Sequence, residues 1–209
     1  MTPETGLCLS EGDAVLAETA EAINGILNQH GVGVWPSSFA DAPADIKELL
    51  ASEQLTEQEN SRLKTHFLLS REKLLDAIHA AGRAPNVAGG GSLEGFCVET
   101  AIQYPQLHVI DKTLDYSGFF PLHVNVSLEG VGSDEIGQVL SGSGMTYRFG
   151  IADGRILSLT MSCPDPLSGW VFTFNGGAPH GGVLDDTAAG TKVLVQAIGP
   201  PRFNRNYTG

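Results

Sequence analysis

The sequence predicts a mainly β protein whose helices are confined to its N-terminal part. Apolar residues recur at helical spacing before about residue 85 and at strand spacing after it. The strand candidates are short and separated by Gly, Pro and Asp turns, which is typical of a sandwich or a barrel and not of a βαβ fold. We therefore predict an N-terminal helical segment (1–85), an antiparallel β-barrel domain (96–200) and a C-terminal tail (201–209).

The first two helices are predicted from apolar spacing and from their end residues. A helix over about 13–29 places apolar residues at i, i+4 and i+7, and Gly31 follows as a stop. A short helix over about 43–51 comes next. Asp41 is its candidate N-cap, and Pro43 stands in the first turn, where a missing N–H costs nothing.

The third helix has the strongest sequence support. Thr56 and Glu59 form a capping box, in which each side chain satisfies an unpaired backbone N–H at the helix start. One apolar stripe then continues to Gly82, which ends the helix. The glycine-rich stretch 86–95 lacks the Lys-Ser or Lys-Thr of a phosphate-binding loop, so a flexible linker is expected there.

Eight strands are expected from Phe96 onward. Asp153-Gly154 is a hairpin signal between two of them. The expected strands cover about 96–103, 106–111, 119–128, 135–141, 144–150, 155–163, 169–174 and 191–198. Alternation along each strand should give the barrel one apolar face.

Composition limits the classes of partner that are expected for this chain. The formal net charge of −12 over 209 residues repels phosphate backbones and anionic lipid, so no nucleic-acid partner and no membrane partner is expected. A small anionic substrate stays open, because one buried Arg can dominate a local site. The three cysteines form no CxxC pair, and neither a secretory signal nor a run of about 20 apolar residues is visible. We expect a cytoplasmic protein.

Two segments carry the chemistry. The stretch 133–149 reads SDEIGQVLSGSGMTYRF, and 171–183 reads VFTFNGGAPHGGV. Together they resemble the two characteristic motifs of the cupin superfamily. Glu135 is followed by six residues and a glycine, and His180 ends a PxGxxH-like motif in which Asn175 replaces the proline. The resemblance implies a cupin-type jelly-roll barrel and a pocket built around Glu135 and His180.

The chain departs from the metal-binding cupins in one respect. Those proteins carry a His-x-His pair three or four residues before the motif glutamate, whereas only His123, further upstream, is found here. A reduced site of His123, Glu129 or Glu135, and His180 could still hold a divalent metal ion. No cofactor is certain, and the alternative is a metal-free pocket in which Glu135 and His180 act as acid and base.

Further pocket residues are expected on the neighbouring strands. His123 lies on a strand whose polar face is either solvent-exposed or part of the pocket lining. Tyr147 and Arg148 point to opposite faces of their strand, so one of them should face inward. An inward Arg148 would clamp a carboxylate, and an inward Tyr147 would donate to a substrate oxygen. Tyr116 is a candidate for the barrel mouth.

The overall layout is similar to that of the 4-hydroxylaminobenzoate lyase family. This resemblance implies a carbon–nitrogen lyase that converts a hydroxylamino aromatic acid into a dihydroxybenzoate and ammonia. Glu135, His180 and His123 would be catalytic, and Tyr116, Tyr147 and Arg148 would bind an aromatic carboxylate. A metal-dependent cupin dioxygenase and a non-catalytic small-molecule-binding cupin are the alternatives. The cupin resemblance also favours a homodimer.

Overall fold

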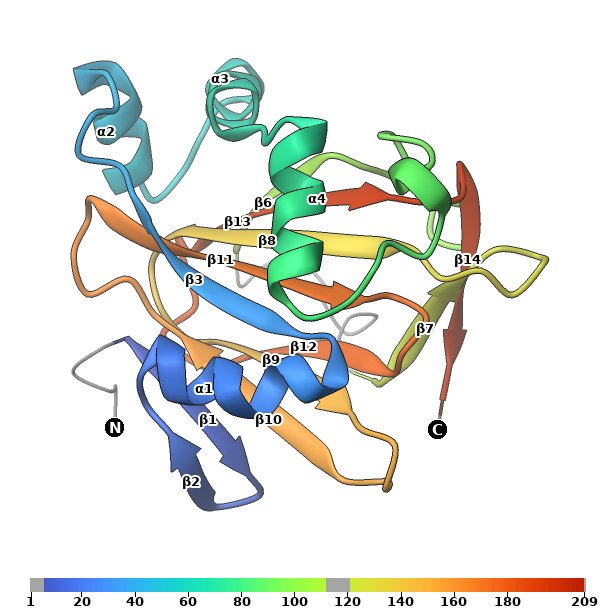
Figure 1. Ribbon diagram of the computed structural model, residues 1–209. Coiled ribbons are helices and arrows are strands. Elements are labelled where there is room, and N and C mark those ends of the chain that lie inside the picture. Colours follow the sequence, from blue (N-terminus) through green and yellow to red (C-terminus); the bar gives the residue numbers. More distant parts are fainter. Residues whose placement is uncertain (1–5, 112–120, 209) are drawn as a thin grey trace.

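Strands dominate the computed structural model, which describes residues 6–111 and 121–208 (Figure 1). The strands are β1 (Leu7–Glu11), β2 (Ala14–Ala17), β3 (Gly33–Ser38), β4 (Phe96–Cys97), β5 (Ile102–Gln103), β6 (Gln106–Val109), β7 (His123–Val126), β8 (Asp134–Ser141), β9 (Met145–Gly150), β10 (Ile156–Met161), β11 (Ser168–Asn175), β12 (His180–Leu184), β13 (Lys192–Ile198) and β14 (Arg202–Tyr207). The helices are α1 (Ala20–Leu27), α2 (Ala44–Ala51), α3 (Glu57–Phe67) and α4 (Arg71–Ala80), with short 3-10 turns at Asn28–His30 and Ala88–Gly90. The fold is therefore mainly β, as predicted.

The strands form two sheets. One has nine strands in the order β2-β1-β10-β9-β12-β7-β14-β4-β5, and the other has five in the order β3-β11-β8-β13-β6. All pairings that link the named strands are antiparallel except that of β14 with β4. Within residues 6–111 and 121–208 the strands form two sheets and no closed barrel is found, so the predicted jelly-roll barrel is not confirmed.

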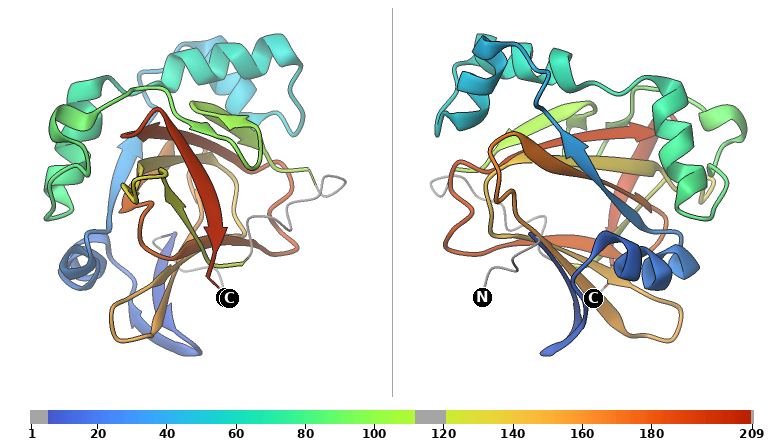
Figure 2. Two further views of the ribbon diagram at one scale, coloured as in Figure 1. Left: turned by 90° about the vertical axis from the view of Figure 1, so that its right-hand side faces the viewer. Right: turned by 60° about the vertical axis from the view of Figure 1, so that its left-hand side comes forward.

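Helices cover the outer face of the five-stranded sheet (Figures 1 and 2). Apolar side chains of α2 and α3 pack with Leu107, Leu140 and Leu194 of that sheet. Leu74 and Ile78 of α4 form a second cluster with strands β8 and β13. Because the helices bury this outer face, the opposite face of the sheet is left to line the interior.

The N-terminal segment is not purely helical, which corrects two expectations. Residues 14–17 form β2 and pair with β1, so the predicted helix over 13–29 begins only after its N-cap, Thr19. Residues 33–38 form β3, at the edge of the five-stranded sheet. An edge strand tolerates Pro36, whose missing N–H would disrupt a central strand. Strand pairing over long sequence separations overrides the local apolar spacing here.

The predicted third helix is broken into α3 and α4. Its capping box at Thr56 and Glu59 is confirmed. The break falls at Leu69, whose backbone N–H donates to Gln196 Oε1 (2.9 Å) and whose carbonyl accepts from Gln196 Nε2 (3.1 Å). Ser70 then caps α4. The amide of Gln196 thus takes up backbone groups that would otherwise continue the helix, and it fixes both helices to β13.

The C-terminal end corrects a further expectation. Residues 202–207 are not a tail but form β14, which lies between β7 and β4 in the nine-stranded sheet. A strand at 180–184, β12, was not expected either. The hairpin at Asp153-Gly154 is confirmed between β9 and β10, with Gly154 at φ +83°. No helix of the described residues is long and apolar enough to cross a membrane.

Candidate functional site

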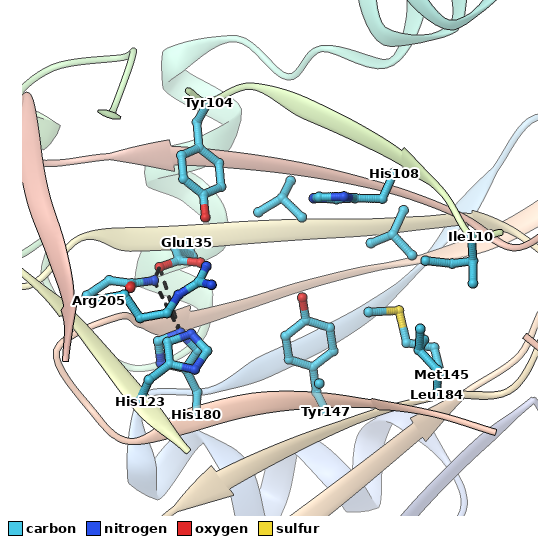
Figure 3. A pocket seen from close by; sticks show the side chains of 14 residues that line it. Tyr104, His108, Ile110, His123, Glu135, Met145, Tyr147, His180, Leu184 and Arg205 are labelled. Carbon is cyan, nitrogen blue, oxygen red and sulfur yellow. Dashed lines mark hydrogen bonds and ion pairs between the residues drawn. The ribbon is translucent and has the colours of Figure 1, made fainter. Parts of the chain in front are cut away.

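A cavity of about 50 Å³ lies between the two sheets. The five-stranded sheet contributes one wall and the nine-stranded sheet the other (Figure 3). The described residues that line it are Tyr104, His108, Ile110, His123, Asn125, Glu135, Met145, Tyr147, His180, Gly182, Leu184, Val193, Val195 and Arg205. Polar side chains gather at one end of the cavity and apolar side chains at the other, as Figure 3 shows.

Glu135 enters the cavity from β8 and is almost fully buried. Its Oε1 accepts hydrogen bonds from Asn125 Nδ2 (2.6 Å) and from Ser133 Oγ (2.9 Å). Gly176 passes beside this carboxyl group, and a Cβ there would lie 2.8 Å from Glu135 Oε1. The lack of a side chain at Gly176, next to the motif glycine Gly177, therefore allows the turn before β12 to approach the carboxyl group closely.

Two histidines face Glu135 from the opposite sheet. His123 in β7 and His180 in β12 are cross-strand neighbours, and their ring centroids lie 4.5 Å apart. His180 Nε2 lies 3.9 Å from Glu135 Oε1. Glu135 and His180 thus belong to different sheets and meet across the gap between them.

Each histidine is held in one tautomer. Nδ1 of His123 lies 3.0 Å from the carbonyl oxygen of Pro121, and Nδ1 of His180 lies 2.9 Å from that of Ala178. A carbonyl oxygen only accepts hydrogen bonds, so both Nδ1 atoms carry the proton. The Nε2 atoms of both rings are consequently hydrogen-bond acceptors, and that of His180 accepts from Asn125 Nδ2 (3.4 Å).

Burial keeps both imidazoles neutral. Desolvation lowers the pKa of His180 to about 4; the hydrogen bond to Ala178 opposes this shift and the positive charge of Arg205 adds to it. Desolvation and then the neighbouring His180 lower the pKa of His123, also to about 4. Near neutral pH the two rings are therefore bases or ligands and not cations.

The turn before β12 explains why Asn175 replaces the proline of the motif. Its Oδ1 accepts from the backbone N–H of Gly177 (2.8 Å) and from Nδ2 of Asn86 (2.7 Å). The first of these bonds is an Asx turn, which tightens the chain just before His180. An asparagine at this position thus sets the turn by hydrogen bonding, where a proline would set it by its fixed φ.

Of the other predicted site residues, some line the cavity and others do not. Tyr147 lines the cavity, whereas Arg148 belongs to the opposite face of β9 and is not part of the described lining. Glu129 is exposed on a turn, away from the cavity. Tyr116 lies outside the described residues. The open question about the His123 strand is answered, because its polar face is the buried one.

Sequence reasoning missed four polar lining residues. Asn125 and Arg205 are cross-strand partners on β7 and β14, and both are nearly fully buried. Tyr104 and His108 come from the β5–β6 region of the other wall. Asn125 shares the face of His123 at i and i+2, and this spacing was the available signal. For Arg205 the sequence carried no such signal, because its segment was interpreted as a tail.

The donor types at the polar end suit a divalent ion, although they are not gathered closely. Two imidazoles and one carboxylate form a set used by metalloenzymes. In the described part of the chain, however, no three His, Cys, Asp or Glu side chains are grouped tightly enough to be recognised as a metal site. The amide of Asn125 lies between Glu135 and His180, 2.6 Å from one and 3.4 Å from the other.

Comparison with known proteins identifies the fold. No protein-family model and no curated protein matches the chain. Among solved structures, it is similar to an acireductone dioxygenase from Bacillus anthracis that has a cadmium ion in its active centre. The TM-score is 0.55 at 14% sequence identity, and the match covers 94% of each chain. The chain has a cupin fold.

Within this cupin fold, the polar end of the cavity contains both motif residues, Glu135 and His180. His123 and Asn125 stand at i and i+2 on β7, and both line the same end of the cavity.

Proposed function

We propose that this chain is a metal-dependent small-molecule enzyme of the cupin type, with His123, His180 and Glu135 as metal ligands, and that it acts as a dioxygenase. One observation carries the proposal. Both histidines donate Nδ1–H to backbone carbonyls and so present Nε2 lone pairs to the cavity, opposite a buried carboxyl group. Metal-ligating histidines are oriented by such bonds to the second ring nitrogen.

The similar structure supports the same proposal. The acireductone dioxygenase, which is similar in fold, has a cadmium ion in its active centre. When bound, a divalent ion would supply a Lewis-acidic and, for iron, a redox-active centre. The residues of this chain provide the rest: Ser133 orients Glu135, and the apolar wall of Met145 and Leu184 limits access of water.

Metal analysis tests the proposal directly. The purified protein is analysed by inductively coupled plasma mass spectrometry, and chelated protein is then titrated calorimetrically with Fe²⁺, Mn²⁺, Ni²⁺ and Zn²⁺. We expect about one ion per chain, and His180→Ala or Glu135→Gln should weaken its affinity by about 10–100-fold or more. His108→Gln is the matched control, since His108 lines the same cavity outside the ligand set. Absence of any binding, or an equal loss in the control, would refute the assignment.

An acid–base lyase resembling the 4-hydroxylaminobenzoate lyases is the second candidate. It is favoured by the facing Glu135 and His180, which are 3.9 Å apart and bridged by the amide of Asn125. The cavity of about 50 Å³ argues against an aromatic substrate, because it is much smaller than an engineered cavity of about 150 Å³ that binds benzene. Ammonia release from 4-hydroxylaminobenzoate by metal-free protein would establish this candidate in place of the first.

A further inference from the structure

Two tyrosine hydroxyls face the cavity from opposite sides. Tyr104 lies on the wall of the five-stranded sheet and Tyr147 on that of β9, and Figure 3 shows both hydroxyl groups directed into the space between. Neither hydroxyl has a hydrogen-bond partner among the described residues. Neither oxygen is among the buried polar atoms that lack a partner, so both hydroxyls border the open space of the cavity. A ligand atom that accepts hydrogen bonds would satisfy both.

The protonation state of the two phenols makes them donors. Burial, and then the nearby Glu135, raise the pKa of Tyr104 and of Tyr147 far above the ordinary range. Both hydroxyls therefore keep their proton at any physiological pH. Each neutral phenol offers an O–H to a hydrogen-bond acceptor and has no negative charge that would repel an anion.

Arg205 adds a positive charge to the same space. It lies opposite Asn125 across the β7–β14 pairing, so the two side chains share the inward face of the sheet. Its side chain is buried and lines the cavity, and it is the only arginine or lysine in the described lining. The charge acts on the cavity groups, since it contributes to the lowered pKa of His108, His123 and His180. In a chain of net charge −12, this guanidinium is a local attraction for an anion.

The other end of the cavity is apolar. Met145, Leu184 and Ile110 lie there, away from Glu135, His123 and His180. The small cavity volume, about 50 Å³, suits a short aliphatic chain better than a ring. The site therefore offers donors and a positive charge to one end of a ligand and apolar contact to the other.

From this arrangement we propose that the substrate is a short-chain aliphatic carboxylate, whose oxyanion is bound by Arg205 and the hydroxyls of Tyr104 and Tyr147. This inference rests on the proposed function in that it assigns the same cavity to the substrate. It does not require a metal for binding. Arg205 thus takes the role that the sequence assigned to Arg148.

Calorimetry with matched probes tests the inference. The protein is titrated with propanoate and with its neutral analogue propanamide, once after chelation and once with Mn²⁺ added. We expect the acid to bind at least about tenfold more tightly than the amide in both states. Arg205→Met should weaken acid binding by about thirtyfold or more, and Tyr147→Phe by roughly tenfold.

The controls separate this inference from the proposed metal site. Arg202→Met changes an exposed arginine on the same strand and should leave acid binding unchanged. Tyr147→Phe removes one oxygen atom, so it keeps the test valid even if Arg205→Met fails to fold. Equal affinity for acid and amide, or no acid binding in protein that binds metal, would overturn the carboxylate assignment and leave the metal proposal standing. Acid binding in protein that binds no metal would support the carboxylate assignment and overturn the metal proposal.

Discussion

Replacing Arg83 by methionine should destabilise the fold severely. Arg83 follows α4 and forms an ion pair with Asp134, whose side chain is 0% exposed. It also donates to the carbonyl of Gly31 (2.9 Å) and to Thr173 Oγ1 (3.3 Å), so it joins three segments behind the cavity. Without the guanidinium, the carboxyl group of Asp134 keeps a hydrogen bond from the backbone N–H of Asn86 (2.7 Å) but no counter-charge among the described residues.

The magnitude follows from the burial of the pair. Removing one partner of a buried ion pair costs about 3–5 kcal/mol. For a chain of this length, each kcal/mol shifts Tm by about 2–4 °C, so Tm should fall by about 6–20 °C. Burial already raises the pKa of Asp134 against the effect of Arg83. In Arg83→Met that pKa rises further, so the folded state binds the proton more strongly and the loss should shrink as pH falls towards it.

Urea unfolding followed by tryptophan fluorescence measures the free energy of unfolding. Arg62→Met is the matched control, because its ion pair with Asp45 is about half exposed (48% and 52%) and should contribute at most about 1 kcal/mol. The double variant Arg83→Met with Asp134→Leu should recover most of the loss, since it leaves no unpaired charge. A loss below about 1 kcal/mol for Arg83→Met, or no recovery in the double variant, would refute the reasoning.

Three further predictions concern single residues. His123 and His180 have a pKa of about 4 in the folded protein and 6.5 ordinarily, so the unfolded state binds protons more strongly. The free energy of unfolding should therefore fall as pH drops from 6.5 towards 4, by on the order of 3 kcal/mol for each histidine. A urea midpoint that stays constant across that window would contradict this. Thr56→Ala removes a capping box and should cost about 1 kcal/mol in urea unfolding, with Thr56→Ser as the rescue. Gly176→Ala places a Cβ 2.2 Å from Ser133 Oγ and 2.9 Å from the Ser133 carbonyl oxygen, so it should lower Tm and weaken calorimetric metal binding. Unchanged affinity would show that Ser133 does not orient Glu135.

Local patterns were sufficient for parts of the fold and of the site. The capping box at Thr56 and the hairpin at Gly154 depend on a few adjacent residues, and both are confirmed. Glu135 and His180 were found because their motifs are contiguous in sequence, and the structure places both at one cavity. The expected homodimer and the cytoplasmic location stay predictions.

The predictions that were wrong concern residues whose strand partners are distant in sequence. Residues 14–17 have helical spacing but become a strand through pairing with β1, which itself pairs with β10, about 150 residues away. Arg205 looked like part of a tail, because its strand is defined only by β7 and β4. Asn125 became informative only once the buried face of β7 was known. Sequence reasoning therefore found the motif residues and missed those that long-range pairing adds.

One side chain sets the width of the site. Phe174 pairs with Glu135 across β11 and β8, and its ring centroid lies 4.6 Å from that of His180 in the facing sheet. The acid and the imidazole belong to different sheets, so the distance between them reflects how far the sheets stand apart, with Phe174 acting as the spacer. Fluctuations in the spacing of the two sheets would change that distance directly. A core mutation, hydrostatic pressure or heating could then tune the chemistry of this protein without touching any residue that contacts its ligand.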